Sequence, residues 1–317
     1  MSADTERDTL RKKLPEWVET SRKLSASGKV AQYIPELAGA PAGALGITIL
    51  GPGPGDLLQA GDVGCRFTMQ SISKVFTLLL ALMDRGEDGV FAKVGMEPTG
   101  DDFNSMLKLE LVEPGIPFNP MINAGAITVT SLIEGEDPLT KFDRILAFFR
   151  KLSGDPELTY NPRVYKSEAL TAHRNRSLAY FLKDNAVLGP DEDVEDILDV
   201  YFKHCSIEVD CGHLARLGLV LALDGKDPVD GTQLIPTRYV QIVKTFMFSC
   251  GMYNASGEFA IRVGIPAKSG VAGGILAVVP DRYGIGVIGP ALNRYGNSTA
   301  GVHLLETLSG ALDWSLF

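Results

Sequence analysis

The chain has 317 residues, of which 45% are hydrophobic and 22% are charged, and its formal net charge is -9. This composition is typical of a globular protein with a core large enough for one or two domains, and it argues against a disordered chain. Because the balance is acidic and no block of consecutive lysines or arginines is present, we expect no binding to nucleic acid.

Residues 1–17 lack the apolar segment of a signal peptide, and no run of about 18 uncharged apolar residues predicts a membrane span. We therefore expect a cytoplasmic protein that contacts no membrane. The cysteines give no sign of a metal or redox site, because only Cys205 and Cys211 lie close together and they lack the two-residue gap of such motifs. Free, buried thiols are the expected state of Cys65, Cys205, Cys211 and Cys250.

The first predicted elements are a helix and two strands. Residues 9–25 have helical spacing with charges on one side, and Pro15 interrupts the pattern near its start. Residues 44–50 form a short β-branched run, and the glycine- and proline-rich residues 51–56 predict a turn. Residues 64–70 predict a second strand, which leads into a helix.

The middle of the chain is predominantly helical. The predicted helices, several of which end in glycine or asparagine, span residues 71–86, 137–154, 167–185, 193–206 and 213–225. The last segment differs, because its β-branched and glycine-rich runs predict strands, and a helix closes the chain. These strands and the closing helix span residues 258–264, 269–280, 283–289 and 298–314.

Strands at both ends around a helical middle predict one sheet assembled from the two termini. We expect an α+β fold in which an antiparallel sheet, flanked by helices, carries an inserted all-helical domain. The sheet domain would comprise residues 1–67 and 259–317, and the helical domain residues 68–258. The junction between them is the expected place for a functional pocket.

A serine and a lysine stand three residues apart at the start of the predicted helix 71–86. On a helix, positions i and i+3 share a face, so the Ser71 hydroxyl and the Lys74 amine can meet without help from distant sequence. The alternative interpretation is that Ser71 caps the helix and Lys74 is a solvated first-turn residue. The S-x-x-K pattern alone is too common to decide between the two.

Two features favour a chemical role for this pair. Lys74 opposes the helix dipole and precedes a segment that is apolar nearly all the way round, so we expect it to be buried. To act as a base near neutral pH its pKa must fall by roughly three from a reference near 10.4, a difference of about 4 kcal/mol that desolvation can supply. The second feature is Lys268-Ser269-Gly270 at the start of a predicted strand, because S-x-x-K and a late K-[ST]-G both belong to the serine β-lactamase and penicillin-binding plan. Together they predict serine acyl-enzyme chemistry.

Beyond these motifs, the sequence closely resembles the serine-dependent glutaminases. The matching segments, spread over nearly the whole chain, are AQYIPELA, QSISKVF, NPMINAGAI, VYKSE, RNRSLAYFLK, YFKHCSIEV, CGMYNASGEFA, GIPAKSGVAGGI and GNSTAGVHLLETLS. The resemblance implies the serine β-lactamase/penicillin-binding-protein-like fold and hydrolysis of L-glutamine to L-glutamate and ammonia. It implies no metal and no organic cofactor, and an assembly that is a homodimer or a homotetramer.

The resemblance also implies catalytic roles. Ser71 would be the nucleophile and Lys74 its general base, while Tyr253 would relay a proton. The backbone N–H groups of Ser71 and Val271 would form the oxyanion hole. These assignments fit the residue types, since a neutral lysine can accept the serine proton and two N–H groups can hold the developing negative oxygen.

Substrate binding follows from the same resemblance. Beside Ser71, Tyr253 and Val271, the residues implied are Tyr33, Asn123, Glu168, Asn175 and Tyr201. Glu168 suits the α-ammonium group of glutamine, and Asn123 and Asn175 suit its α-carboxylate. Tyr33 would close over the site.

Each binding residue has a structural interpretation when it is considered alone. Glu168 could be a solvated first-turn glutamate, Asn123 a helix cap and Asn175 a surface residue. The three tyrosines could be core or interface residues. The four histidines form no H-E-x-x-H or Ser-His-Asp pattern, so they are assigned no role.

Two other functions stay open at this point. One is a different Ser-Lys amidohydrolase acting on asparagine or on a β-lactam-type substrate; asparagine is shorter by one methylene, a difference limited to about 1 to 3 kcal/mol. The other is a non-catalytic glutamine-binding protein, which would be expected to have lost Ser71 or Lys74. The loop of residues 51–64 is longer than the resemblance predicts, and no feature supports activation by phosphate.

Overall fold

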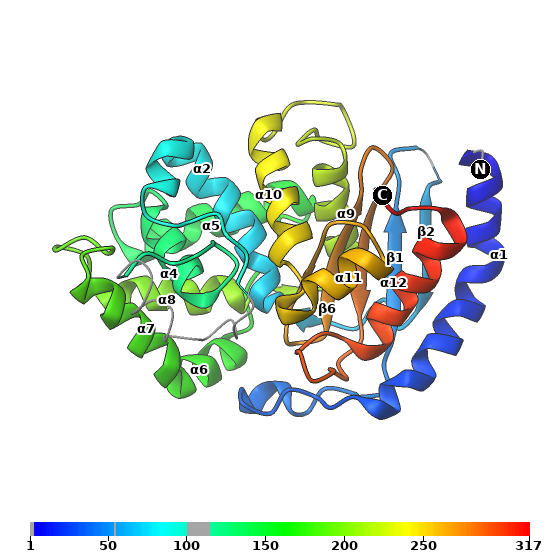
Figure 1. The fold of residues 1–317 in the computed structure, drawn as a ribbon, viewed down its shortest axis with the longest axis horizontal. Coiled ribbons are helices and arrows are strands. Elements are labelled where there is room, and N and C mark those ends of the chain that lie inside the picture. Colours follow the sequence, from blue (N-terminus) through cyan, green and yellow to red (C-terminus); the bar gives the residue numbers. More distant parts are fainter. Residues whose placement is uncertain (1–2, 54, 100–114) are drawn as a thin grey trace.

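A computed structural model describes residues 3–53, 55–99 and 115–317. Its main sheet has five strands in the order β2-β1-β7-β6-β5, and all neighbours are antiparallel. The strands are β1 (Gly46–Leu50), β2 (Leu57–Gly61), β5 (Ala267–Ser269), β6 (Gly274–Val279) and β7 (Tyr283–Ile288). Figure 1 shows blue β1, from the start of the chain, beside the orange strands from its end. The prediction of one sheet built from both termini is therefore confirmed.

Helices from different parts of the chain cover the two faces of this sheet. On one face, α1 (Ala3–Arg22) and α12 (Thr299–Leu312) share an apolar core with strand residues such as Ile47 and Val287 (Figure 1). On the other face, α9 (Cys211–Ala222) packs against β1, β6 and β7. The sheet is therefore the middle layer of a three-layer arrangement.

Glycine in β7 explains how closely α9 approaches the sheet. A Cβ atom on Gly284 would lie 2.0 Å from both the carbonyl oxygen of Ala215 and the amide nitrogen of Leu219. Helix backbone atoms cannot yield to such contacts, so a larger side chain would separate the two elements. α9 thus packs on the sheet although it belongs to the predicted helical domain 68–258, whose boundaries stay a prediction.

The rest of the helical part includes α2 (Ser73–Phe91), whose residues 73–82 are all buried. Burial on every side is what its continuous apolar sequence predicts. The other helices here are α4 (Asn123–Leu132), α5 (Pro138–Ser153), α6 (Pro162–Thr171), α7 (His173–Asp184), α8 (Val194–Cys205) and α10 (Thr237–Cys250). α11 (Ser256–Arg262) instead contributes to the apolar core that α1 and α12 share with the sheet. Short 3-10 turns are η1 (Lys23–Ser27), η2 (Pro35–Leu37), η3 (Gln70–Ile72) and η4 (Tyr253–Ala255).

The strand prediction for residues 258–264 is wrong, because most of this segment belongs to α11. Phe259 and Val263, four residues apart, are buried, whereas Ile261 between them is 88% exposed. That pattern has the period of a helix face and not of a strand. An ion pair between Glu258 and Arg262, at 3.1 Å and four residues apart, also stabilises the helix.

The second strand near the N-terminus is also misplaced in the prediction. Of residues 64–70, only Phe67–Thr68 form a strand, β3, which pairs with β4 (Glu208–Val209) in a separate two-stranded sheet. The main sheet instead uses β2, which lies inside the segment 51–64 that the sequence treated as a loop. β2 alternates between exposed and buried positions, but it is too short and polar to stand out.

Two further differences concern helices. The predicted helix 167–185 is divided into α6 and α7 at Ala172, whose ψ of 40° interrupts the helical backbone. α10 was not predicted, although Val240, Val243 and Met247 bury one helical face. In the described part of the chain, no helix is long and apolar enough to cross a membrane.

Candidate active site

A small cavity of about 100 Å³ lies where η3 meets α6, α7 and α8. All the site residues predicted from the sequence line it, except Lys74 and Tyr253. Those that line it are Tyr33, Ser71, Asn123, Glu168, Asn175, Tyr201 and Val271. Segments far apart in the sequence therefore converge here, while the individual roles stay predictions.

Ser71 lies in η3, directly before α2. The preceding residue, Gln70, has a φ of +49°, a conformation that costs a residue with a side chain about 1 kcal/mol. The K-S-G segment packs closely against this turn, because a Cβ atom on Gly270 would lie 2.5 Å from the carbonyl oxygen of Met69. Glycine is therefore the residue that fits there without displacing the turn that presents Ser71.

Lys74 is 1% exposed on the first turn of α2. Its Nζ donates to the carbonyl oxygen of Met121 at 3.1 Å and to Oδ1 of Asn123 at 2.7 Å. Burial lowers the pKa of Lys74 to about 8, and the more distant Glu168 opposes part of this effect. A substantial neutral fraction near physiological pH follows from this environment.

Asn123 connects Lys74 to Asn175 at the lining of the cavity. Its Oδ1 accepts from Lys74, and its Nδ2 donates to Oδ1 of Asn175 at 2.9 Å. The donors and acceptors thus run in one direction from Lys74 through Asn123 to Asn175. This order fixes which end of each carboxamide faces which neighbour.

Glu168, on α6, is 7% exposed and lines the cavity. Burial raises the pKa of Glu168 to about 7, and the Nε2 of Gln70, 3.5 Å from its Oε2, opposes this shift. Tyr201 is 2% exposed on α8, whereas Tyr33 is 59% exposed. A buried carboxyl group in a small cavity suits a ligand that brings a positive charge.

Tyr253 lies beside the K-S-G segment, Lys268-Ser269-Gly270. It has a φ of +52°, and its hydroxyl donates to the carbonyl oxygen of Ser269 at 3.1 Å. Burial raises the pKa of Tyr253, and a hydrogen bond with Ser71 opposes this shift. The phenol is therefore a proton donor at neutral pH and lies beside the predicted nucleophile.

A second buried lysine, Lys268, lies next to Tyr253. Its Nζ donates to the carbonyl oxygen of Ser269 at 2.7 Å and is 4.5 Å from the centre of the Tyr253 ring. Burial, and then the charge of Lys74, hold the pKa of Lys268 well below its ordinary value. Ser269 therefore accepts from both the tyrosine and the lysine.

Sequence reasoning missed several residues of this site. Gln70, Arg174 and Cys205 line the cavity, and each stands next to or near a predicted residue in a matching segment. Lys268 was noted only as part of a fold motif. Its proximity to Tyr253 joins positions on either side of α11, which no local pattern reports.

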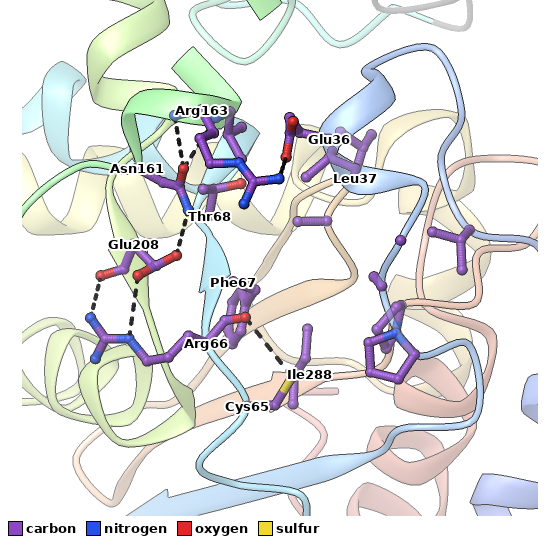
Figure 2. A pocket seen from close by; sticks show the side chains of 18 of the residues that line it. Glu36, Leu37, Cys65, Arg66, Phe67, Thr68, Asn161, Arg163, Glu208 and Ile288 are labelled. Atoms are coloured by element: carbon purple, nitrogen blue, oxygen red, sulfur yellow. Dashed lines mark hydrogen bonds and ion pairs between the residues drawn. The ribbon is translucent and has the colours of Figure 1, made fainter. Parts of the chain in front are cut away.

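A larger cavity of about 550 Å³ borders residues 35–41 and shares Val271 with the first. Figure 2 shows that its charged side chains pair with one another, Arg163 with Glu36 at 3.0 Å and Arg66 with Glu208 at 3.8 Å. Because both arginines already have carboxylate partners, the charges of this cavity do not indicate that it binds an ionic ligand. Within the three described ranges, no group of three or more His, Cys, Asp and Glu side chains could hold a metal ion.

Comparison with known proteins gives one consistent result. The profile of the family described as Glutaminase matches residues 28–317. A glutaminase of Geobacillus thermodenitrificans is 54% identical over 307 residues, which cover 97% of this chain and 98% of that protein. A crystal structure of a probable glutaminase from Bacillus subtilis superposes with a TM-score of 0.90 at 42% identity, and the match covers 97% of each chain.

A second Bacillus subtilis structure is the covalent complex of a glutaminase with 5-oxo-L-norleucine, formed by reaction with 6-diazo-5-oxo-L-norleucine. It superposes with a TM-score of 0.86 at 40% identity, covering 97% of this chain and 99% of that one. The β-lactamase-like fold predicted from the sequence is confirmed by these solved relatives. With matches that extend along nearly its whole length, the chain belongs to the glutaminase family.

Proposed function

We propose that this glutaminase hydrolyses the side-chain amide of L-glutamine through an ester on Ser71, with Lys74 as the general base. The observation that carries the proposal is the environment of Lys74: it is 1% exposed and donates to two neutral oxygens at the wall of the cavity that Ser71 lines. A lysine held in this way loses its proton more readily than a solvated lysine.

The first step is attack by the serine oxygen. A neutral amine has two hydrogens, which match the two acceptors at Met121 and Asn123, so its lone pair is left to accept the Ser71 proton. The serine oxygen then attacks the amide carbon of glutamine. The N–H groups of Ser71 and Val271 stabilise the negative oxygen of the tetrahedral intermediate.

The second step is loss of ammonia. The nitrogen must gain a proton before the carbon–nitrogen bond breaks, and Tyr253 is the proposed relay because its phenol stays protonated and bonds to Ser71. The proton that Lys74 took from Ser71 then replaces the proton that Tyr253 gave to the leaving nitrogen. Water, deprotonated by the same groups, then hydrolyses the γ-glutamyl ester to L-glutamate and frees Ser71.

The polar wall of the cavity orients the substrate. Glu168 pairs with the α-ammonium group, and Asn175, whose Oδ1 is taken by Asn123, directs its amide N–H groups to the α-carboxylate. A cavity of about 100 Å³ favours an amino acid over a bulky β-lactam. Asparagine stays an alternative, because one methylene is worth only about 1 to 3 kcal/mol of discrimination.

The decisive experiment measures ammonia release from L-glutamine, with L-asparagine in parallel and Ser71→Ala as the control. We expect turnover of glutamine that the variant abolishes. Reaction of the wild type with 6-diazo-5-oxo-L-norleucine, followed by peptide mass spectrometry, should place the label on Ser71. A label elsewhere, or an active Ser71→Ala variant, would refute Ser71 as the nucleophile, and a folded wild type without turnover would favour a binding role.

A cytoplasmic location and a homodimeric or homotetrameric assembly are further proposals, and both come from the sequence. The acidic charge and the four free cysteines support the first. Light scattering on the eluting protein tests the second by its molar mass. Catalysis by these side chains requires no cofactor, so activity should survive exhaustive dialysis against a chelator.

A further inference from the structure

His204 lies buried at the end of α8, directly beside the turn that presents Ser71. Its Nδ1 is 2.8 Å from the hydroxyl of Ser73, and its Nε2 is 3.1 Å from the hydroxyl of Thr130 on α4. The Ser73 hydroxyl in turn lies 2.7 Å from the carbonyl oxygen of Gln70, to which it donates. A continuous polar path thus connects α4 and α8 to the backbone just before the nucleophile.

The protons on this path have two consistent arrangements. Burial, and then the charge of Lys74, lower the pKa of His204 to about 3, so the ring is neutral and carries one N–H. If that proton is on Nδ1, it is donated to Ser73 and Ser73 donates to Gln70, while Thr130 must turn its only proton from the carbonyl oxygen of Ala126, 2.8 Å away, to Nε2. If the ring proton is on Nε2, it is donated to Thr130, and Ser73 must give its only proton to the ring.

The two arrangements differ at the carbonyl oxygens of Gln70 and Ala126. In the first, the Gln70 carbonyl oxygen accepts from both the backbone N–H and the hydroxyl of Ser73; in the second it keeps the backbone donor alone. Gln70 needs this support, because its φ of +49° is unfavourable for a residue with a side chain. Each arrangement gives up one bond from a hydroxyl to a carbonyl oxygen, Thr130 to Ala126 at 2.8 Å in the first and Ser73 to Gln70 at 2.7 Å in the second. The first is favoured because Ala126 lies in the regular helix α4, whereas Gln70 has the unfavourable backbone conformation.

We infer that His204 is a positioning residue for Ser71: as the Nδ1–H tautomer it orients Ser73 so that two donors hold the Gln70 carbonyl and aim the nucleophile. The inference rests on the proposed role of Ser71. His204 touches neither substrate nor reacting atoms in this arrangement. Its effect is therefore on the rate of acylation and not on the affinity for glutamine.

A pair of amide substitutions separates this role from simple packing. Asparagine places its Nδ2 donor close to the position of histidine Nδ1, whereas glutamine places its Nε2 close to that of histidine Nε2. His204→Asn should keep kcat within about twofold of the wild type, while His204→Gln and His204→Leu should lose about tenfold in kcat with an unchanged KM. The rate of labelling by 6-diazo-5-oxo-L-norleucine should follow kcat across the series.

His303 provides the matched control. Its Nδ1 is 2.9 Å from the hydroxyl of Ser21, so it makes the same kind of contact, but between α1 and α12 on the far face of the sheet. His303→Asn and His303→Gln should leave kcat and KM unchanged. Melting temperatures of all five variants show whether a loss of activity comes from a loss of folded protein.

The tautomer itself can be measured. Nitrogen-15 shifts of the histidine rings, assigned with the His204→Asn variant, should show His204 protonated on Nδ1 at pH 7. An Nε2–H ring, equal kcat in all three His204 variants, or a rise in KM without a fall in kcat would each overturn the inference. If Ser71→Ala stays active, the proposed nucleophile fails first; if it is inactive while the His204 variants match the wild type, only the positioning role fails.

Discussion

The two segments that meet at Ser71, the start of α2 and the K-S-G segment with its neighbour Tyr253, are built alike and differ in one respect. Each has a residue with positive φ, Gln70 on the α2 side and Tyr253 on the K-S-G side, and each has a buried lysine. Lys74 donates to an amide side chain and a carbonyl, whereas Lys268 donates to the Ser269 carbonyl and lies over a tyrosine ring; burial lowers the pKa of both lysines. Lys74 stands three residues after Ser71 at the start of α2, so it is the lysine proposed to exchange a proton with the serine, and Lys268 instead supports Tyr253 and the Ser269 backbone.

The largest effect is expected when the two lysines are replaced in turn by methionine, which has a similar length and no proton to exchange. Lys74→Met should lower kcat by about a thousandfold, because the serine loses its base. Lys268→Met should lower it by no more than about tenfold, because only a supporting contact to the Ser269 carbonyl is lost. Steady-state kinetics on both variants checks this order, and equal losses would mean that the two lysines act together.

Removing the hydroxyl of Tyr253 or of Tyr201 gives the next effect. Tyr253→Phe keeps the ring under Lys268 but removes the proton relay, so kcat should fall by about a hundredfold. Tyr201→Phe, in α8 and at the lining of the cavity, should change mainly KM. If Tyr253→Phe keeps its kcat, another group protonates the leaving ammonia.

The pH profile of kcat/KM tests two groups with shifted pKa values, Glu168 and Lys74, at once. Glu168 must be ionised to bind the ammonium group and Lys74 must be neutral, so both require a pH above their pKa values, about 7 and about 8. In the wild type, kcat/KM should therefore rise with pH, with a limiting slope of two below pH 7. Glu168→Gln should reduce that slope to one and raise KM by about thirtyfold, through loss of a charge-assisted hydrogen bond. An unchanged slope would remove Glu168 from substrate binding.

The smallest effect concerns the contact between the K-S-G segment and the turn that presents Ser71. Gly270→Ala places a Cβ atom against the Met69 carbonyl, at 2.5 Å before relaxation, so kcat should fall several-fold and the free energy of unfolding by about 1 to 3 kcal/mol. Gly257→Ala is the control, because a Cβ atom there meets nothing within 4 Å. Thermal unfolding and kinetics on both variants check this. If Gly270→Ala behaves like the control, the K-S-G segment and the turn that presents Ser71 are not in rigid contact.

Much of the fold could be predicted from the sequence. The β-branched runs at the two ends predict a shared sheet, and the apolar run after Lys74 predicts a helix buried on all sides. β2 could not be predicted, because a short polar strand is defined by its pairing with β1 and not by its own pattern. α11 was mistaken for a strand because its β-branched residues outweighed a helical period that fills only two turns.

The residues of the site also divide into those that local sequence patterns could predict and those that they could not. Local spacing identifies Ser71 and Lys74, since they share one helical turn, whereas the substrate-binding residues were implied only by resemblance. Glu168 considered alone has the pattern of a solvated helix residue, yet it is 7% exposed. His204 had no pattern at all, because its partners Ser73 and Thr130 lie on two other helices. Contacts of this kind depend on tertiary packing, which periodicity does not report.

The pairing of β1 with β7 also affects how the protein is made. A ribosome completes β1 early, but the strand that pairs with it emerges only after almost the entire chain has been synthesised. Until then the only strand of the main sheet available to pair with β1 is β2, and a two-stranded hairpin alone is at best marginally stable in water, so the main sheet cannot be completed during most of synthesis. The K-S-G segment beside Ser71 is also synthesised late, so nascent chains stay inactive until synthesis is nearly complete.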